Sequence, residues 1–311
     1  MEKFKFKDID GTEILVRKWA TIDNRLKGVI QIAHGMVEES SRYDYVAKRL
    51  NKEGYIVYAN DHRGHGETAL SREELGYISD EDGFHCMVNN LKQLNGIIKI
   101  EYPNLPIVLL GHSMGSFLSQ RYAELYGDSI DYLVLTGSNG KPKLITKLGI
   151  KIAERDIKKY GRRHVGRRIN KLAFEAYNNN FQPTRTQFDW LSSVDEEVDE
   201  YIKNDLCGFK CSSSFYYDLI NGLWTIHKNE NLCMIPESLP IYIFAGDKDP
   251  VGYNGKGIIS LYNCFKDLII NDITYKLYKD GRHEMFHEYN KDDVISDLIL
   301  WLNKRIWGVE I

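Results

Sequence analysis

Short runs of apolar residues recur along the chain and predict a sheet of eight strands. Two early runs, KFKFK from Lys3 and EILVRKW from Glu13, alternate apolar and polar positions, as half-buried antiparallel strands do. The middle runs are nearly continuous, as strands covered on both faces are. The six later runs begin at Gly28, Tyr55, Pro106, Tyr132, Pro240 and Ile273. Helix-length segments at 41–52, 84–101, 114–126 and 291–306 alternate with them, which predicts an α/β fold with a mostly parallel sheet and helices on both faces.

One long segment interrupts this alternation. Between about residues 139 and 237 no strand-like run occurs, while helix formers and charged residues dominate. A stretch of this length is too long for a simple connection between two strands. We therefore expect a helical cap at 139–237 over the carboxyl edge of the sheet, inserted into a core formed by 1–138 and 238–311.

Composition excludes several classes of protein. The 311 residues are 43% hydrophobic and 27% charged with a net charge of −3, which argues against disorder and against a coiled coil. No apolar run reaches the roughly 18 residues of a membrane span, and MEKFKFKDID lacks the apolar stretch of a signal peptide. Five cysteines without framework spacing indicate reduced thiols in a cytoplasmic protein. We expect no nucleic-acid partner.

The strand that begins at Pro106 runs directly into the candidate nucleophile. Its last residue opens the pentapeptide GHSMG at 111–115, a G-x-S-x-G motif that helix formers follow as far as Tyr126. A serine on a tight strand-to-helix turn projects its hydroxyl away from the backbone, and the flanking glycines permit the close approach that the turn demands. The following helix points its N-terminus at the reaction centre, where negative charge develops. The motif predicts that Ser113 is a nucleophile.

A serine nucleophile needs a histidine base and a carboxylate that orients the histidine. In this sheet topology the residues follow in the order Ser, Asp, His, on loops after later strands. The strand from Pro240 leads to Asp247 and Asp249, and the strand from Ile273 leads to His283. We choose Asp249 because the turn that ends in Pro250 places it beyond the strand end. Asp249 could alternatively cap a helix that starts nearby.

His283 also begins the string HEMFH at 283–287, which matches the H-E-x-x-H zinc motif. A zinc hydrolase would use His283 and His287 as ligands and Glu284 as the base, on an established helix and with a third ligand. Here the first histidine follows a strand and a glycine, so it falls in a loop. A zinc site would also leave Ser113 and Asp249 without a task. We therefore expect no metal.

Two loops after earlier strands complete the candidate site. The loop after the strand from Gly28 and the residue after the nucleophile supply backbone N–H groups to a tetrahedral oxyanion in such folds. This assigns the oxyanion hole to the amides of Met36 and Met114. On the loop after the strand from Tyr55, we expect a buried Asp–Arg pair, Asp61 and Arg63, to stabilise the loop.

Taken together, five segments resemble the monoacylglycerol lipase and lysophospholipase group of the α/β-hydrolases. They are HGMVEESSRY, DHRGHGET, GHSMGS, AGDKDPVG and GRHEMFHE. The resemblance implies an α/β-hydrolase fold and a cofactor-free serine hydrolase that cleaves carboxylic esters, with a monoacyl lipid as substrate and the acyl chain under the cap. By position it also implies that Glu38, Arg42 and His112 contact the polar head group. A serine aminopeptidase on the same fold and a non-catalytic binding module are the alternatives.

The segment 141–171 is strongly basic. It contains twelve Lys and Arg residues against two acidic residues, in a chain whose net charge is negative. One interpretation is a solvated face that the acidic stretch 195–200 offsets within the cap. The other is a surface that rests on anionic lipid, where each basic residue contributes ~1 kcal/mol.

Overall fold

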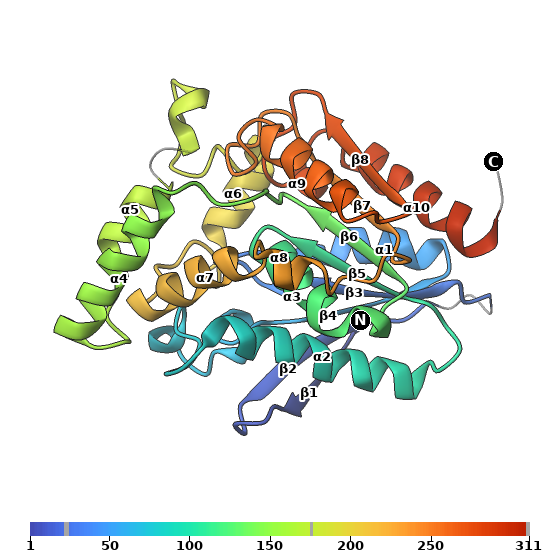
Figure 1. The fold of residues 1–311 in the computed structure, drawn as a ribbon, viewed down its shortest axis with the longest axis horizontal. Helices are drawn as coiled ribbons and strands as arrows, with labels where there is room; N and C mark the ends of the chain where they lie inside the picture. The colour runs from blue at the N-terminus through green and yellow to red at the C-terminus, as the bar shows by residue number, and fades with distance from the viewer. Residues whose placement is uncertain (22–24, 175–176, 309–311) are drawn as a thin grey trace.

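The computed structural model describes residues 1–21, 25–174 and 177–308. Its centre is one sheet with the strand order β1-β2-β4-β3-β5-β6-β7-β8 (Figure 1). The strands are β1 (Glu2–Lys7), β2 (Glu13–Trp19), β3 (Gly28–Ala33), β4 (Tyr55–Asn60), β5 (Ile107–His112), β6 (Tyr132–Thr136), β7 (Ile241–Gly246) and β8 (Ile273–Tyr278). Each predicted strand is present, so the prediction of an eight-stranded sheet is confirmed.

The strands from β3 onward are all parallel. β2 is antiparallel to both of its neighbours, β1 and β4, and every other neighbouring pair is parallel. The alternating sequences of β1 and β2 thus mark the antiparallel end of the sheet, as predicted. Because parallel strands end at the same edge, the loops after β3, β4, β5, β6, β7 and β8 all leave the sheet on one side.

Helices cover both faces of the sheet. Neighbouring residues of β5 divide between the faces, since Leu109 packs in one apolar cluster and Leu110 in the other. The helices α2 (Gly83–Glu101), α3 (Met114–Tyr126) and α9 (Lys256–Asp267) pack on the side of Leu109, and α1 (Asp44–Lys52) and α10 (Lys291–Trp307) on the side of Leu110. No helix within the described residues is both long and apolar enough to cross a membrane.

The regular elements that the structure describes between β6 and β7 are helices, joined by turns and loops, and one isolated β-bridge pairs Val165 with Ser212. The helices are α4 (Thr146–Tyr160), α5 (Arg167–Phe174), α6 (Asp195–Lys203), α7 (Ser213–Thr225) and α8 (Asn229–Leu232). In Figure 1, α4, α5 and α7 lie on the left and α10 on the right. α7 packs closely on the core, because an added Cβ at Gly222 would lie 2.5 Å from the ring of Phe84 in α2. The division into a core and a cap at 139 and 237 stays a prediction.

The N-terminus of α3 lies unusually close to the end of β3. A Cβ atom added at Gly115 would lie 2.0 Å from the carbonyl oxygen of Ala33 and 2.6 Å from that of His34. One added at Gly111 would lie 2.4 Å from the carbonyl oxygen of Gly115. Since these neighbours are backbone atoms, they cannot rotate away as a flexible side chain would. Only glycine therefore fits at both positions of the pentapeptide.

We predict that Gly115→Ala destabilises the fold by at least about 2 kcal/mol, because overpacking a well-packed interior costs about 1–3 kcal/mol. Gly96→Ala is the matched control, since Gly96 lies within α2 and an added Cβ there meets no atom within 4 Å. Alanine stabilises a helix interior by about 0.5–1 kcal/mol relative to glycine. Denaturant unfolding of both variants measures the difference, and equal stabilities would contradict the close approach of α3 to β3.

Candidate active site

Ser113 occupies the turn between β5 and α3. Its backbone has φ 51° and ψ −118°, which is uncommon for any residue other than glycine. The Ser113 amide donates a hydrogen bond of 2.9 Å to the carbonyl oxygen of Thr136 at the end of β6. Ser113 is partly exposed, whereas its neighbours His112 and Met114 are buried. This combination of a strained backbone and an accessible side chain is typical of functional sites.

The loops after β3, β6 and β8 converge next to this turn. A Cβ added at Gly35, after β3, would lie 3.1 Å from Cδ2 of His112 and 3.3 Å from Cβ of Ser113. A Cβ added at Gly137, after β6, would lie 3.0 Å from Cε1 of both His112 and His283. The ring centroids of the two histidines are 4.9 Å apart. The structure therefore brings Ser113 and His283 to the same small region at the carboxyl edge of the sheet.

His283 contacts Asp249, as the order of the motifs predicted. Nδ1 of His283 and Oδ1 of Asp249 are 3.0 Å apart, and both residues are buried. Burial lowers the pKa of His283, but the charge and hydrogen bond of Asp249 outweigh it and raise that pKa above its ordinary value. Asp247 instead accepts a hydrogen bond from the amide of Asp280, 2.8 Å away. Of the two candidate aspartates, Asp249 is the one beside His283.

The loop after β3 and the start of α3 each contribute one candidate oxyanion-hole amide beside the Ser113 turn, those of Met36 and Met114. Glu38 bends back so that its Oε1 accepts hydrogen bonds from the amide of Gly35 at 2.5 Å and from the Tyr43 hydroxyl at 2.9 Å. Met36 lies in the turn that these bonds enclose, and Met114 is the first residue of α3. Within the described residues, neither amide donates a hydrogen bond to another group of the protein. Both N–H groups are thus available, as the oxyanion-hole hypothesis requires.

Glu38 and Arg42 belong to a buried network of charges. Arg42 donates to Glu38 at 2.6 Å and to both oxygens of Glu284 at 2.6 and 2.7 Å, and its guanidinium lies 4.8 Å from the Tyr201 ring centroid. Burial alone would raise the pKa of Glu284, but the charge and hydrogen bonds of Arg42 hold that pKa well below its ordinary value. These contacts give Glu38 and Arg42 an internal task, which favours a stabilising role over the head-group contact that the resemblance implied.

His112, the third predicted head-group residue, lies against His283 instead of in this network. Its side chain is buried, and burial together with the neighbouring His283 lowers the pKa of His112 well below its ordinary value. A neutral imidazole beside the candidate base adds no positive charge there. Contact between His112 and a substrate stays a prediction.

The string HEMFH does not have the geometry of a zinc helix. His283 lies in a loop and points Nδ1 at Asp249, while a short 3₁₀ turn spans only Met285–His287. Glu284 is bound to Arg42, and Nε2 of His287 lies 3.3 Å from the Arg42 carbonyl oxygen. No group of three His, Cys, Asp or Glu within the described residues is arranged to hold a metal. The zinc hypothesis gains no support from this geometry.

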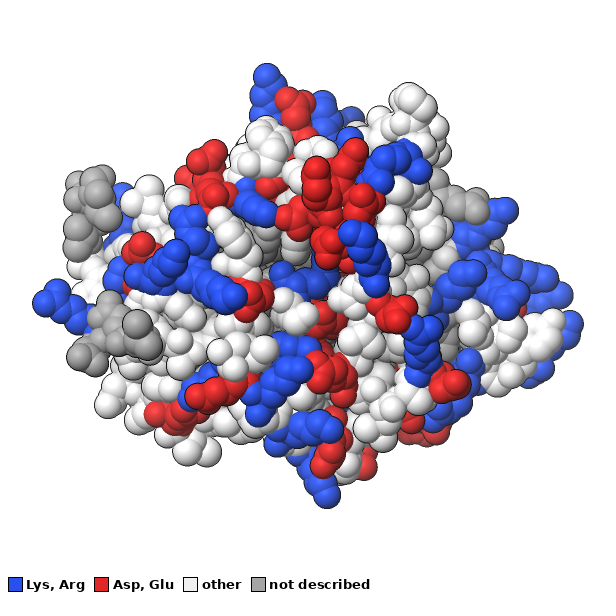
Figure 2. Space-filling model, turned by 180° about the vertical axis from the view of Figure 1, so that it is seen from behind, with Lys and Arg blue, Asp and Glu red and all other residues white. Residues whose placement is uncertain are grey.

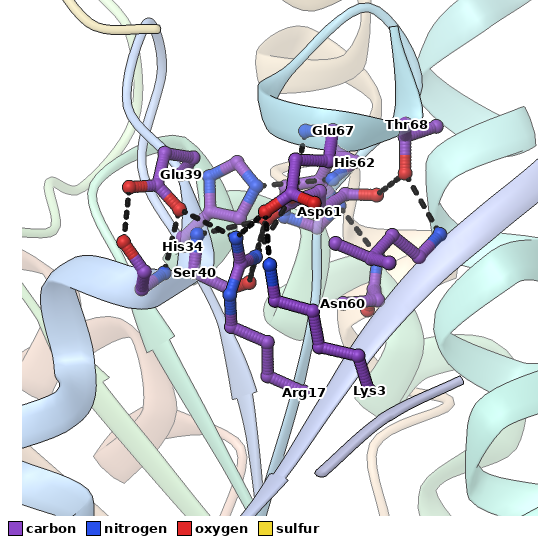
Figure 3. Close-up of polar contacts among 12 residues, drawn as sticks. Lys3, Arg17, His34, Glu39, Ser40, Asn60, Asp61, His62, Glu67 and Thr68 are labelled. Carbon is purple, nitrogen blue, oxygen red and sulfur yellow. Dashed lines mark hydrogen bonds and ion pairs between the residues drawn. The ribbon is translucent and has the colours of Figure 1, made fainter. Parts of the chain in front are cut away.

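Asp61 stabilises the neighbouring loops through a partner that the sequence did not suggest (Figure 3). Nη1 of Arg17, on β2, lies 2.9 Å and 3.0 Å from the two oxygens of Asp61 and 2.6 Å from Oγ of Ser40. The amide of Ser40 donates to Asp61 at 2.9 Å. Arg63 instead donates to Asp8 at 2.6 Å. The expectation that Asp61 pairs with Arg63 was therefore wrong, because each residue has a different partner. The ion pair joins β2 to the loops after β3 and β4.

Trp190 is another residue at this site that sequence reasoning missed. It lies in the segment between α5 and α6, and its ring centroid is 5.0 Å from that of His283. The residues around Trp190 in the sequence do not indicate that it contacts His283, because the two residues are 93 positions apart in the chain.

The sequence is similar to those of known enzymes. The family model described as "Serine aminopeptidase, S33" matches residues 24–290. Human monoglyceride lipase is 36% identical over 302 residues, which cover 95% of this chain and 88% of that enzyme. A monoacylglycerol lipase of Mycolicibacterium smegmatis is 36% identical over 132 residues, which span 42% of this chain and 45% of that enzyme.

A solved structure with the same architecture is a thermostable carboxyl esterase from Bacillus coagulans in complex with glycerol. It superimposes with a TM-score of 0.91 and 26% identity, and the match covers 98% of both chains. This agreement extends over core and helical segment alike, and the family model spans the candidate site from Met36 to His283. The chain therefore belongs to the α/β-hydrolase family described as serine aminopeptidase S33 and, within it, to the monoacylglycerol lipase group.

Proposed function

We propose that this chain is a carboxylic ester hydrolase that cleaves monoacyl lipids through an acyl-enzyme on Ser113. The observation that carries the proposal is the buried contact of His283 with Asp249 beside the Ser113 turn. The names of the monoglyceride lipase relatives support the substrate class, and the similar esterase was solved with glycerol, the alcohol of a monoacylglycerol. A lysophospholipid would present the same kind of acyl ester.

In the first half of the proposed reaction, the acyl group moves to Ser113. Asp249 accepts the Nδ1–H of His283, which leaves Nε2 to take the proton of the Ser113 hydroxyl. As the serine oxygen bonds to the ester carbon, the carbonyl oxygen becomes negative and accepts from the amides of Met36 and Met114. The positive end of the α3 dipole lies at the same place. The ester C–O bond then breaks, and the alcohol leaves with the proton from His283.

The second half returns the enzyme to its starting state. His283 takes a proton from water, whose oxygen attacks the acyl carbonyl while the same two amides hold the oxyanion. The bond to Ser113 breaks, the serine recovers its proton from His283, and a carboxylic acid leaves. All of these steps use side chains, backbone amides and one water, so the proposed reaction requires no cofactor.

We further propose that the basic segment 141–171 contacts anionic lipid. Among the described residues, the acidic stretch 195–200 forms salt bridges with Arg185, Lys203 and Lys291, which lie outside the basic segment. Basic side chains gather at the right edge of Figure 2, over α4 and α5. Exposed apolar side chains of the same region are Leu144, Ile145, Leu148 and Leu172. Cations beside exposed apolar groups fit a surface that meets lipid head groups and the outer acyl region.

A cytoplasmic location is the companion proposal. It is supported by the five cysteines, which the structure records as free thiols. Reduced cysteines are ordinary in the cytosol, where thiol reductants keep them unpaired. The inner surface of a cell membrane is also its anionic side.

Ester hydrolysis should accelerate as the acyl chain lengthens. Each buried methylene contributes ~0.8 kcal/mol, so kcat/KM should rise by up to about fourfold per methylene until the acyl space is filled. A series of monoacylglycerols and p-nitrophenyl esters measures this, with Ser113→Ala as the inactive control. A flat profile from two to ten carbons would argue against a lipid pocket, and faster cleavage of aminoacyl amides would favour the aminopeptidase alternative.

Asp249→Asn should lower kcat by about 10³- to 10⁴-fold, because the orienting carboxylate selects the tautomer and stabilises the imidazolium. Asp247→Asn is the matched control two residues away. It should leave kcat within about threefold of the wild-type value, because among the described residues the Asp247 carboxylate accepts a hydrogen bond only from the Asp280 amide and does not contact His283. Steady-state kinetics on one soluble ester compares them. Equal losses in two folded variants would show that the assignment of Asp249 is wrong.

The protein should sediment with phosphatidylserine vesicles and not with phosphatidylcholine vesicles, and salt should release it because exposed charges are screened within ~10 Å at 0.1 M. A variant in which four basic residues of the segment 141–171 are replaced by Glu should no longer sediment with the vesicles, while it still hydrolyses a soluble ester. The replaced residues are Lys151, Lys158, Arg167 and Arg168. The matched control reverses four core lysines: Lys7, Lys52, Lys99 and Lys266 to Glu. Binding that is equal on neutral vesicles, or lost equally in both variants, would refute lipid contact through 141–171.

A further inference from the structure

Residues 189–193, which we call the clamp segment, run alongside the loop that carries His283. The amide of Glu284 donates to the carbonyl oxygen of Leu191 at 2.8 Å, and the amide of His283 donates to that of Trp190 at 3.4 Å. The Ser192 hydroxyl donates to the carbonyl oxygen of His287 at 2.7 Å. Two segments about 90 residues apart in sequence therefore share main-chain hydrogen bonds at the candidate base.

A buried carboxylate adds to this contact. Oε1 of Glu288 accepts from the amide of Ser193 at 3.0 Å and from the amide of Arg282 at 2.9 Å. The Ser193 hydroxyl donates to the second oxygen of Glu288. Arg282 in turn donates to the carbonyl oxygens of Ser192, at 3.0 Å, and Asp189. Since charge-assisted hydrogen bonds in the interior are strong, these bonds fix the clamp segment against the histidine loop.

The Trp190 side chain continues the contact on the imidazole itself. The indole and imidazole centroids are 5.0 Å apart with a tilt of 38° between the rings, and both side chains are buried. Tyr177 and Phe174 pack against the indole at 4.8 and 6.0 Å. His112 contacts the same imidazole at 4.9 Å. With two rings against it, His283 has little room to rotate away from Asp249.

The indole N–H does not determine this position. Nε1 of Trp190 is buried and has no acceptor within the described residues. The ring is therefore located by packing and by the main-chain bonds of the clamp segment. Trp190 could therefore act in two distinct ways. Its aromatic face could position His283, or its unpaired N–H could donate a hydrogen bond to a substrate.

We propose that Trp190 is a positioning residue for His283 and that the clamp segment makes part of the cap a fixed component of the catalytic site. The proposal rests on the proposed function, in which His283 is the base. Asp249 bonds to His283, Glu284 is its neighbour in sequence and His112 lies against its ring, and none of these side chains is altered when Trp190 is replaced. A change in catalysis then reports the position of the imidazole.

Trp190→Leu removes the aromatic face and keeps the main-chain bonds. We expect kcat on a soluble p-nitrophenyl ester to fall about 10- to 100-fold with KM within about twofold, because a base displaced by about 1 Å slows chemistry without changing ester binding. Trp190→Phe retains a flat ring without an N–H and should restore most of kcat. The matched control is Trp224→Leu. The Trp224 indole lies in α7 and donates to Thr146, so this variant should have the kcat of the wild type.

Proton NMR provides a readout that needs no turnover. The far-downfield resonance of the His283 Nδ1–H that bonds to Asp249, identified by its loss in His283→Ala, should persist in Trp190→Phe and Trp224→Leu. It should weaken or disappear in Trp190→Leu. Should Trp190→Leu not fold, Ser193→Ala removes one bond to Glu288 and should lower kcat in the same direction, by a smaller factor.

Wild-type kcat and an unchanged resonance in Trp190→Leu would overturn the proposal. Equal damage in Trp190→Phe and Trp190→Leu with a raised KM would also overturn it, because the N–H would then contact substrate. Failure of the proposed function looks different, since Ser113→Ala would retain ester hydrolysis. In that case the resonance still tests whether Trp190 positions His283 against Asp249.

Discussion

The close approach of α3 to β3 is the constraint on which the site depends. With an added Cβ at Gly115 only 2.0 Å from the Ala33 carbonyl oxygen, the helix can begin here only because residue 115 has no side chain. This contact sets the tight turn in which Ser113 has φ 51°. It also places the positive end of α3 beside the loop that contains Met36. One steric requirement thus determines where the serine, the helix dipole and the oxyanion loop lie.

Buried charges then fix the loops around that turn. Arg17 binds Asp61 and Ser40, which joins the loops after β3 and β4, and Arg42 binds Glu38 and Glu284, which joins the loops after β3 and β8. Removing one partner of such a buried pair costs about 3–5 kcal/mol, because the remaining charge has no counterpart. The clamp segment adds a third connection, from the chain between β6 and β7 to the histidine loop. Any movement of the helices between β6 and β7 that lifts this segment would also displace His283.

Much of this architecture could be predicted from sequence because its signals are local. Strands β3 to β7 are short apolar runs, and the position of Ser113 follows from glycine spacing within five residues. Asp249 and His283 could be found because chain order reflects the order of the parallel strands. The partner of Asp61 could not, since it depends on β2 pairing with β4 instead of β3. Trp190 could not either, because its contact with His283 arises only when the helical segment folds back over the sheet.

The central claim is that Ser113 becomes acylated during turnover. Rapid acid quenching of the wild-type protein during hydrolysis of a long-chain monoacylglycerol, followed by peptide mass spectrometry, tests it directly. We predict that the peptide containing Ser113 gains the mass of the fatty acid less one water, and that His283→Ala accumulates little or none of this acylated peptide. Steady hydrolysis without an acylated Ser113, or an acyl group on another residue, would contradict the account.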